Sequence, residues 1–511
     1  MSIREEYLFW RLAHLFVVEQ DYHLARLSDH RDEIWLENFS NKSAQVVRIV
    51  RKNLDWSSTI QRDVERASAA GERIRKQVIK RNLTVLNLYV TPHAPVDHNE
   101  QNITRPFFFP KGEKTKVESI LFSQEDMAEA IERLQQLLDI PVELNDLNAQ
   151  FEEEAAIYQR AVLSYAVKKN EEDQQLFNFS KPFFTYLFIT VQMAIFLMME
   201  LKGGSTNSEN LIRFGAKFNP LILEGEWWRL ITPIFLHIGF LHLLMNTAAL
   251  YLLGAAVERI FGRMRFLFIY LFSGFTGAVA SFLLTPNLSA GASGAIFGCF
   301  GALLYFGAVY PKQFFRSMGM NVIVVIIFNL IFGFTVPGID NAGHIGGLIG
   351  GFLATGIVHF PKKWRLGRQL MFLLGTAALT IGALWIGLSD GQSRLDANSV
   401  NLLAQEHIQQ KEYGEAYQLL SDYVDGGGEG TAETYFFLAY IELERKQLDL
   451  AEEHLQKATV LRQDFHEAYF NLSLIYYERG DKTRALELAK DAQRYKPDEQ
   501  AYQDFIAELE R

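Results

Sequence analysis

Residues 291–310 read GASGAIFGCFGALLYFGAVY, a run without Asp, Glu, Lys or Arg. About 20 mostly apolar residues in a helix cross the roughly 30 Å hydrocarbon core of a bilayer. Gly294, Gly298 and Gly301 share one face of such a helix, next to Ser293. Lipid tolerates small and polar groups at this depth only where other helices cover them. Residues 293–310 of this run are therefore predicted to be a span inside a membrane-embedded helical bundle.

Six further stretches have the length and apolar character of spans. Between Phe183 and Leu388 only 19 of 206 residues are charged, against 91 of the other 305. The chain is thus predicted to be a polytopic α-helical membrane protein with soluble ends, and its domains are expected at 1–180, 181–390 and 391–511. The other six expected spans are 183–201, 234–254, 265–284, 321–336, 342–360 and 369–388.

The distribution of Lys and Arg in the short loops predicts the orientation, because positively charged loops stay on the cytoplasmic side. The loops after spans two, four and six hold nine Lys and Arg, and the loops after three and five hold none. The N-terminus is therefore expected in the cytoplasm, and seven spans place the C-terminus outside the cell membrane. The net charge of −10 argues against a basic nucleic-acid-binding protein.

Residues 1–180 have the mixed pattern of a soluble α+β domain. A hairpin is expected around Asn41, followed by a helix near 56–80, strands at 83–90 and 115–122, and helices near 123–138 and 145–172.

One loop of this domain, TPHAPVDHNE, gathers residue types that bind divalent metals. Their spacing matches no established ligand pattern, and a solvated polar loop is the simpler interpretation. No metal and no cofactor are therefore expected, and the loop is kept as a weak metal candidate through His93, Asp97, His98 and Glu100.

Residues 391–511 are helical and repetitive. Tyr435, Leu438 and Ile441 recur 34 residues later as Tyr469, Leu472 and Ile475. A 34-residue period of paired helices resembles the tetratricopeptide repeat, which predicts an all-α solenoid. Such stacks usually hold a peptide or another protein, so protein or peptide partners are expected for this region.

Polar residues are rare inside the bundle, and each is a functional candidate because burying it in a membrane is costly. Ser293 opens a helix within Gly291-Ala292-Ser293-Gly294, where free backbone N–H groups favour a developing oxyanion. An N-cap serine would have the same sequence. His344 lies in NAGHIGG and also has glycines on its face, including Gly347.

Two glycine-lined helix faces can pack closely enough for a serine and a histidine to share a hydrogen bond. Asn246 follows His242 by one helical turn and shares its face. The pair is suited to stabilise an oxyanion, although a structural hydrogen-bond network between helices explains them equally well.

Together these residues resemble the rhomboid intramembrane serine proteases. The matching residues lie between about 180 and 365, in five motifs. They are Trp228-Arg229, then Thr232, His237, His242 and Asn246, then Gly254, Glu258, Arg259 and Gly262, and finally GASG around Ser293 and GHIGG around His344.

The resemblance implies a six-helix rhomboid core with an added seventh helix. It implies that Ser293 is the nucleophile and His344 the general base and acid, with His242 and Asn246 in the oxyanion hole. Trp228-Arg229 would brace a loop, and Phe297 would stack on His344 in place of a family tyrosine. The expected activity is cleavage of transmembrane protein substrates within membrane lipid, near the extracellular face.

Two other functions are compatible with a polytopic membrane chain. A non-catalytic rhomboid-like protein would hold membrane clients without cutting them, but such relatives usually lack the serine or the histidine. A transporter would show inverted halves or charged residues at the midplane, and the sequence shows neither.

Overall fold

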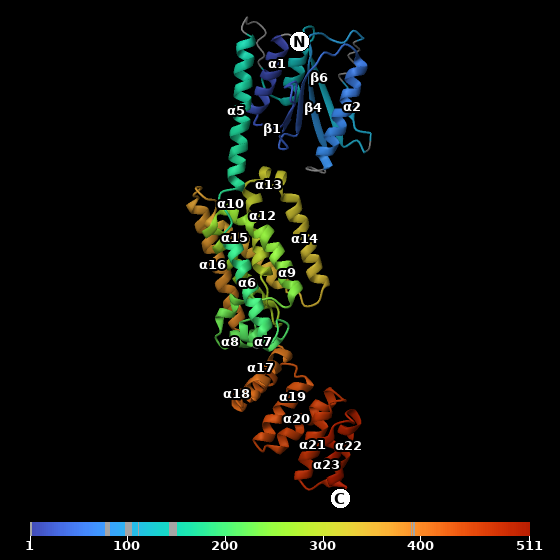
Figure 1. Cartoon of the computed structure of the whole chain (residues 1–511), viewed down its shortest axis with the longest axis vertical. Helices are drawn as coiled ribbons and strands as arrows, with labels where there is room; N and C mark the ends of the chain where they lie inside the picture. Colours follow the sequence, from blue (N-terminus) through green and yellow to red (C-terminus); the bar gives the residue numbers. More distant parts are fainter. Residues whose placement is uncertain are drawn as a thin grey trace. The chain divides into compact units, whose positions relative to one another are not determined.

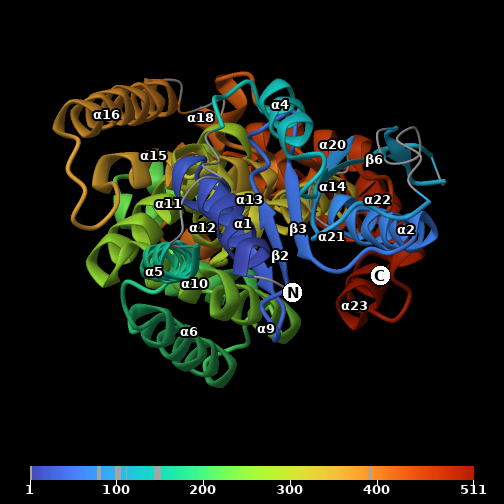
Figure 2. The same cartoon turned by 90° about the horizontal axis from the view of Figure 1, so that it is seen from above.

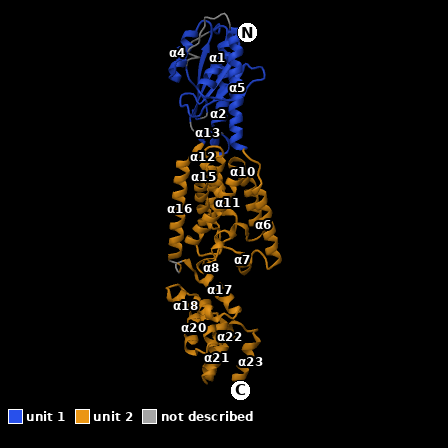
Figure 3. Ribbon diagram, turned by 90° about the vertical axis from the view of Figure 1, so that its left-hand side faces the viewer, with its two compact units in different colours: residues 1–178, 310–318 blue, residues 179–309, 319–511 orange. Residues whose placement is uncertain are grey.

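The computed structural model describes residues 3–76, 82–97, 105–110, 112–142, 151–389, 391 and 394–510, and Figures 1 and 2 show it from two directions. The chain forms two compact units (Figure 3), residues 1–178 with 310–318 and residues 179–309 with 319–511. The first boundary lies close to the expected one at 180. The membrane part and the repeats form a single unit, so a domain boundary at 390 stays a prediction.

The first unit is built on a six-stranded sheet with the order β1-β2-β3-β4-β6-β5. β1, β2 and β3 are antiparallel, whereas β3, β4 and β6 run parallel. The predicted hairpin and the two predicted strands are confirmed, and β1 and β5 are additional. The strands are β1 (His23–Leu27), β2 (Glu33–Glu37), β3 (Val46–Arg51), β4 (Leu83–Val90), β5 (Phe107–Phe108) and β6 (Thr115–Phe122).

Helices cover both faces of this sheet. α1 (Ile3–His14), α4 (Met127–Leu138) and α5 (Phe151–Phe177) build a core on one face, and α2 (Ser57–Ile74) packs on the other. Figures 1 and 2 both show α1 and α2 on opposite sides of the strands. Because both faces are covered, β4 is almost wholly buried.

The short helix α13 (Pro311–Ser317) belongs to the same unit although it is remote in sequence. The Arg316 Nε lies 3.1 Å from Glu37 Oε1, and Gln313 donates a hydrogen bond of 3.3 Å to Asp173. These contacts tie the segment between α12 and α14 to β2 and α5.

In the second unit, each predicted span overlaps a helix. Among the described residues, five helices are long and apolar enough to cross a membrane. α13 and α14 pass the same test only when they are taken together, as a pair bent by 73°. α12 is shorter, at 17 residues, so the number of crossing helices stays a prediction. The seven segments are α6 (Phe184–Leu201), Phe240–Phe261, α11 (Arg263–Leu284), α12 (Ser293–Val309), α14 (Gly319–Thr335), α15 (Asn341–Val358) and α16 (Leu366–Ser389).

The expected second span, 234–254, is wrong at both ends. Pro233 and the positive φ of Gly239 (79°) keep the preceding segment in short turns, and α9 begins at Phe240. α9 (Phe240–Ala249) continues through a π-helical turn at Leu250–Gly254 into α10 (Ala255–Phe261), which ends before Gly262 with φ of 90°. The two ends of this helix are therefore set by the backbone conformation of Gly239 and Gly262 and not by the hydropathy of the sequence.

Glu258, one of the residues in the family motifs, is a helix cap in this structure. Its fully buried carboxylate accepts hydrogen bonds from the backbone N–H groups of Phe183, Phe184 and Thr185 at 2.8–2.9 Å. The hydroxyl of Thr185 adds a fourth bond at 2.7 Å. A charge here is compatible with burial because the free N–H groups and dipole of α6 stabilise it.

The C-terminal region is a series of helix pairs. α19 (Ala432–Glu444) and α20 (Leu448–Leu461) are followed 34 residues later by α21 (His466–Glu478) and α22 (Lys482–Tyr495). α17 (Ala397–Gln409) and α18 (Tyr413–Asp425) form the less regular first pair, and α23 (Gln500–Leu509) closes the series. The predicted helix pairs and their 34-residue period are present, and the tetratricopeptide fold stays a prediction.

The first pair packs on the membrane part of the same unit. Leu403 joins Phe218 and Ile212 in a buried apolar cluster. Asn219 Nδ2 donates to the Arg394 carbonyl at 2.7 Å, and Arg394 Nη1 donates to the Leu283 carbonyl at 2.8 Å. The repeats therefore begin beside the segment that leads from α11 to Ser293.

Candidate active site

Glycine faces bring α12 and α15 into backbone contact. A methyl group on Gly347 would lie 2.0 Å from the Gly294 carbonyl oxygen, and one on Gly351 would lie 2.1 Å from the Gly298 oxygen. A methyl group on Gly301 would likewise lie 2.1 Å from the Leu348 carbonyl oxygen. Only glycine leaves room for such an approach, which is the close packing that the two glycine stripes predicted.

This packing places Ser293 and His344 at the same end of the bundle. Ser293 is the first residue of α12, and His344 lies in the first turn of α15, which begins at Asn341. The His344 ring stacks on Phe297 with ring centroids 4.3 Å apart and 10° between the planes. The expected stacking by Phe297 is therefore present, and it fixes the imidazole beside the N-terminus of α12.

Among the described residues, Ser293 Oγ and His344 share no hydrogen bond, and His344 Nδ1 has no partner. A buried imidazole nitrogen without a partner is unusual, because losing its contact with water costs free energy. Catalytic hydrogen bonds in free enzymes are often long and tighten only when substrate binds. The role of the pair as a catalytic dyad stays a prediction.

Gly291 opens the space next to Ser293. Its φ is 149°, and a methyl group there would lie 2.7 Å from His242 Cε1 and 3.7 Å from Ser293 Oγ. The His242 ring and the serine hydroxyl therefore border one small space. His242 Nδ1 accepts a long hydrogen bond, 3.4 Å, from the Ile238 backbone N–H, which leaves the proton on the Nε2 atom that faces Gly291.

Asn246 is oriented differently from the expectation for an oxyanion donor. Its Nδ2 donates to the His242 carbonyl oxygen at 2.9 Å, and its side chain is almost fully buried. The structure thus brings His242 to Ser293 and leaves the Asn246 amide on the backbone of its own helix. This bond uses one of the two amide hydrogens of Asn246.

Three residues at this end, His237, Asp340 and Lys217, were outside the predicted site. His237 is fully buried against the edge of His242, with ring centroids 5.4 Å apart and no partner for either nitrogen among the described residues. Asp340 accepts bonds from the Ser289 hydroxyl (2.7 Å) and the Gly343 N–H (2.8 Å). Asp340 therefore joins the segment before Ser293 to the start of α15. Its sequence position, as an acidic N-cap four residues before His344, is the signal by which the sequence could have identified it.

Lys217 holds the same segment from the other side. Its buried ammonium group donates to the carbonyl oxygens of Thr285 (2.7 Å) and Asn287 (2.9 Å), and its backbone pairs with Ser289. A buried lysine surrounded by carbonyls gives no periodic sequence pattern, so only the structure reveals it.

Trp228 and Arg229 brace a loop. Arg229 Nη1 donates to the carbonyl oxygens of Ile212 (2.7 Å) and Ala216 (3.2 Å), and the guanidinium lies over the Trp228 ring at 4.4 Å. The Trp228 ring in turn packs against Gly215, where a methyl group would lie 2.6 Å away. The motif orders residues 212–216 and has no direct contact with Ser293.

The weak metal candidate lies far from this site in the sequence. Asp97 accepts from the backbone N–H (2.7 Å) and hydroxyl (2.8 Å) of Ser57 at the start of α2, and His93 Nδ1 is 3.0 Å from Glu125. His98 and Glu100 lie outside the described residues. Within the described ranges, no three His, Cys, Asp or Glu side chains gather as a metal site.

Comparison with known proteins agrees with this geometry. A Rhomboid domain matches residues 224–361. Rhomboid protease GluP of Bacillus subtilis is 39% identical over 481 residues, 93% of this chain and 92% of the relative. The putative rhomboid protease YdcA of the same species is 39% identical over 150 residues, 29% of this chain and 75% of the relative.

Among solved structures, a crystal structure of MamA covers 29% of this chain and 84% of its own at 20% identity, with a TM-score of 0.22 that is too low to establish a shared fold. The similarity to GluP, in contrast, extends over the N-terminal unit and the C-terminal helix pairs as well as the membrane part. With a Rhomboid domain over the Ser293 and His344 helices and 39% identity across nearly the whole length of a rhomboid protease, this chain belongs to the rhomboid protease family.

Proposed function

We propose that the chain is an intramembrane serine endopeptidase in which Ser293 is the nucleophile and His344 the general base. The observation that carries the proposal is the glycine-mediated contact of α12 with α15, which places both side chains at one end of the bundle. A peptide bond inside a transmembrane helix is hydrogen-bonded and covered, so a substrate would unwind near this end before attack. The proposed substrates are transmembrane segments of other proteins.

In the proposed mechanism Ser293 Oγ attacks the carbonyl carbon and its proton passes to His344. The oxyanion would receive hydrogen bonds from the backbone N–H at the start of α12, from His242 Nε2 and from Asn246. His344 would then protonate the leaving amine, and water would hydrolyse the acyl-enzyme. Besides the substrate and water, the proposed steps use backbone and side-chain groups of this chain.

The direct test is covalent labelling of the full-length protein by a fluorophosphonate. Because only an activated serine displaces fluoride from phosphorus at an appreciable rate, we expect one adduct at Ser293, identified by peptide mapping. Ser289, four residues earlier and engaged by Asp340, is the internal control and should stay unmodified. A chain that binds clients without cutting them would give no adduct at Ser293, and this result would contradict the proposal.

We also propose a topology and a role for the repeats. The N-terminal domain would be cytoplasmic and the repeats extracytoplasmic, so that Ser293 lies toward the extracellular face of the cell membrane. The repeats would recruit membrane-protein substrates or partner proteins to the site. Their first pair supports this role because it packs directly on the membrane part through Leu403 and Arg394.

Removing residues 432–511 tests recruitment while it keeps α17 and α18, which contact the membrane part. We expect kcat/KM for client membrane proteins to fall about tenfold through KM, because a recruited substrate gains effective concentration. The kcat for a minimal transmembrane reporter should stay unchanged in the same preparation. An equal loss on clients and reporter would instead indicate a structural role of the repeats.

A further inference from the structure

The N-terminal unit contains a groove that neither the catalytic site nor the family resemblance involves. α2 packs closely over β4 and β6, since a methyl group on Gly71 would lie 2.8 Å from Val85 and 3.1 Å from Thr115. The same face of β1 and β2 is only partly covered beside α2. Between them lies a groove of about 970 Å³, and the helix contributes the small side chains of Ala67 and Ala70 to its lining, together with larger side chains such as Arg66 and Arg73.

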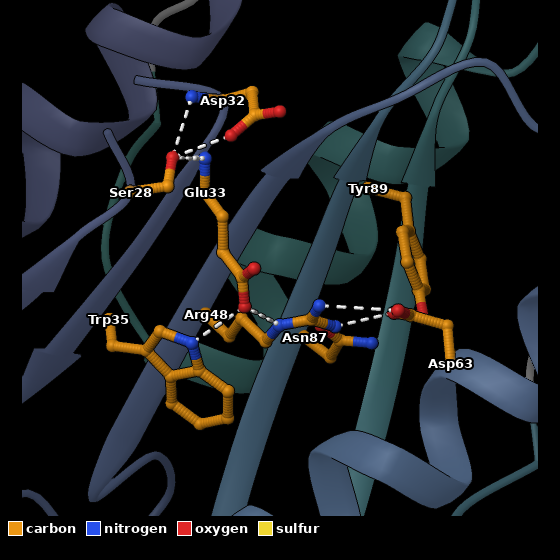
Figure 4. A network of polar contacts seen from close by, with 8 residues as sticks. All are labelled: Ser28, Asp32, Glu33, Trp35, Arg48, Asp63, Asn87 and Tyr89. Carbon is orange, nitrogen blue, oxygen red and sulfur yellow. Dashed lines mark hydrogen bonds and ion pairs between the residues drawn. The ribbon is translucent and has the colours of Figure 1, made fainter. Parts of the chain in front are cut away.

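The floor of the groove is a network of polar side chains centred on Arg48 (Figure 4). The Arg48 guanidinium donates to Glu33 Oε1 at 2.7 Å, to the Asp63 carboxylate and to Asn87 Oδ1 at 3.2 Å. The Tyr89 hydroxyl also donates to Asp63, at 2.8 Å. Burial alone would raise the pKa of Asp63, but the hydrogen bonds from Arg48 lower it. The opposite charges on the floor of the groove therefore neutralise one another.

The rim, in contrast, carries exposed basic side chains. Arg26, Lys52, Arg66 and Arg73 line the groove, are exposed, and form no ion pair with any described residue. In total six Lys and Arg side chains line it against three carboxylates. Residues 1–178 as a whole hold 23 basic and 29 acidic residues, so the positive charge is concentrated here in an otherwise acidic domain.

The walls also include apolar surface. Trp35, Val50 and Ile74 line the groove together with the two alanines. The indole of Trp35 is held in place, because its Nε1 donates to Glu33 at 2.7 Å and Arg48 lies 5.5 Å from its ring centre. A bare inorganic anion would leave these surfaces uncovered.

We propose that this groove is a binding site for a small organic polyphosphate, of the size and charge of a nucleotide. Guanidinium groups bind phosphate oxygens in pairs of hydrogen bonds, and three arginines converge on the rim from β1 and α2. The volume lies in the range of about 300–1,000 Å³ that small-molecule sites occupy. A concave site of this size admits a nucleotide, whereas a duplex or a flat bilayer requires a broad basic face.

The test is isothermal titration of the purified full-length protein in detergent with ATP and with pyrophosphate, without divalent metal. We expect ATP to bind more tightly than pyrophosphate, because the base and ribose cover the apolar walls. Arg66→Glu and Arg73→Glu, both on the exposed rim, should each weaken ATP binding at least about tenfold. Arg62→Glu is the matched control, since it makes the same charge change in α2 outside the groove, and it should leave the Kd within about twofold.

Higher salt should weaken binding, because the rim charges are exposed. Three results would overturn the proposal: no ATP binding by the wild type at millimolar ligand, equal losses in Arg62→Glu and Arg66→Glu, or tighter binding of pyrophosphate than of ATP. An additional experiment measures binding of the protein to vesicles of phosphatidylglycerol. Arg66-dependent capture of the vesicles without ATP binding would assign the groove to a lipid headgroup and would likewise overturn it.

Discussion

Replacing Ser293 with alanine should reduce cleavage of a transmembrane reporter by at least about 1,000-fold, with no change in folding. The side chain is half-buried at the start of α12, and alanine keeps the helix and its contacts with α15. The loss would come from the missing nucleophile alone. The measurement is cleavage in membranes co-expressing the reporter, together with thermal unfolding of the purified variant.

His344→Ala should cause a similar loss, and the double variant should be no less active than either single variant. Residues that act as one catalytic unit are not additive, because removing one makes the other ineffective. Thr190→Ala serves as the control, since its hydroxyl bonds only to the Tyr186 carbonyl on an exposed face of α6. Cleavage by Ser293→Ala at the wild-type rate would refute the assignment of the nucleophile.

The second large effect is expected at Gly347, where no catalytic group is changed. In Gly347→Ala the new methyl carbon would lie 2.0 Å from the Gly294 oxygen and 2.7 Å from the Gly294 carbonyl carbon. Backbone atoms cannot yield as a flexible side chain can, so α12 and α15 must separate. We expect the free energy of unfolding to fall by about 3 kcal/mol. Cleavage should fall about 100-fold even in folded protein, because a displacement of 1 Å misaligns nucleophile and base.

Gly375→Ala provides the matched control in the same membrane part. Gly375 is exposed in α16, and no atom lies within 4 Å of a methyl group placed there. The same substitution should leave cleavage unchanged and should change stability by no more than about 1 kcal/mol, with helix propensity favouring alanine. Thermal unfolding in detergent and reporter cleavage measure both effects. Equal behaviour of the two variants would show that the glycine contact is not what positions the site.

The local chemistry of the site was available from the sequence. Ser293, His344 and the glycines around them stood out because charged and polar groups are rare between Phe183 and Leu388. The helical period also identified the face that each residue shares with its neighbours. The start of the second span was misplaced, because hydropathy does not register the turn at Gly239.

Contacts between distant residues were not available from the sequence. The ties of Asp340 to Ser289 and of Lys217 to Thr285 and Asn287 join segments 51 to 70 residues apart. Each uses a single polar side chain, which leaves no period or spacing to recognise. The groove beside α2 has the same origin, since its charges come from four separate segments of the first unit.

The sequence by itself therefore determined which segments are apolar helices, the 34-residue period of the C-terminal pairs, and which side chains can do chemistry. Those properties follow from residue type, from hydropathy along a segment and from spacing along the chain, all of which the sequence contains directly. Only the tertiary structure decided how near the backbones of α12 and α15 come to each other, that His242 borders Ser293 while Asn246 bonds to its own helix, and that a basic groove lies beside α2. These depend on how separate helices and strands pack, which is a property of the whole chain.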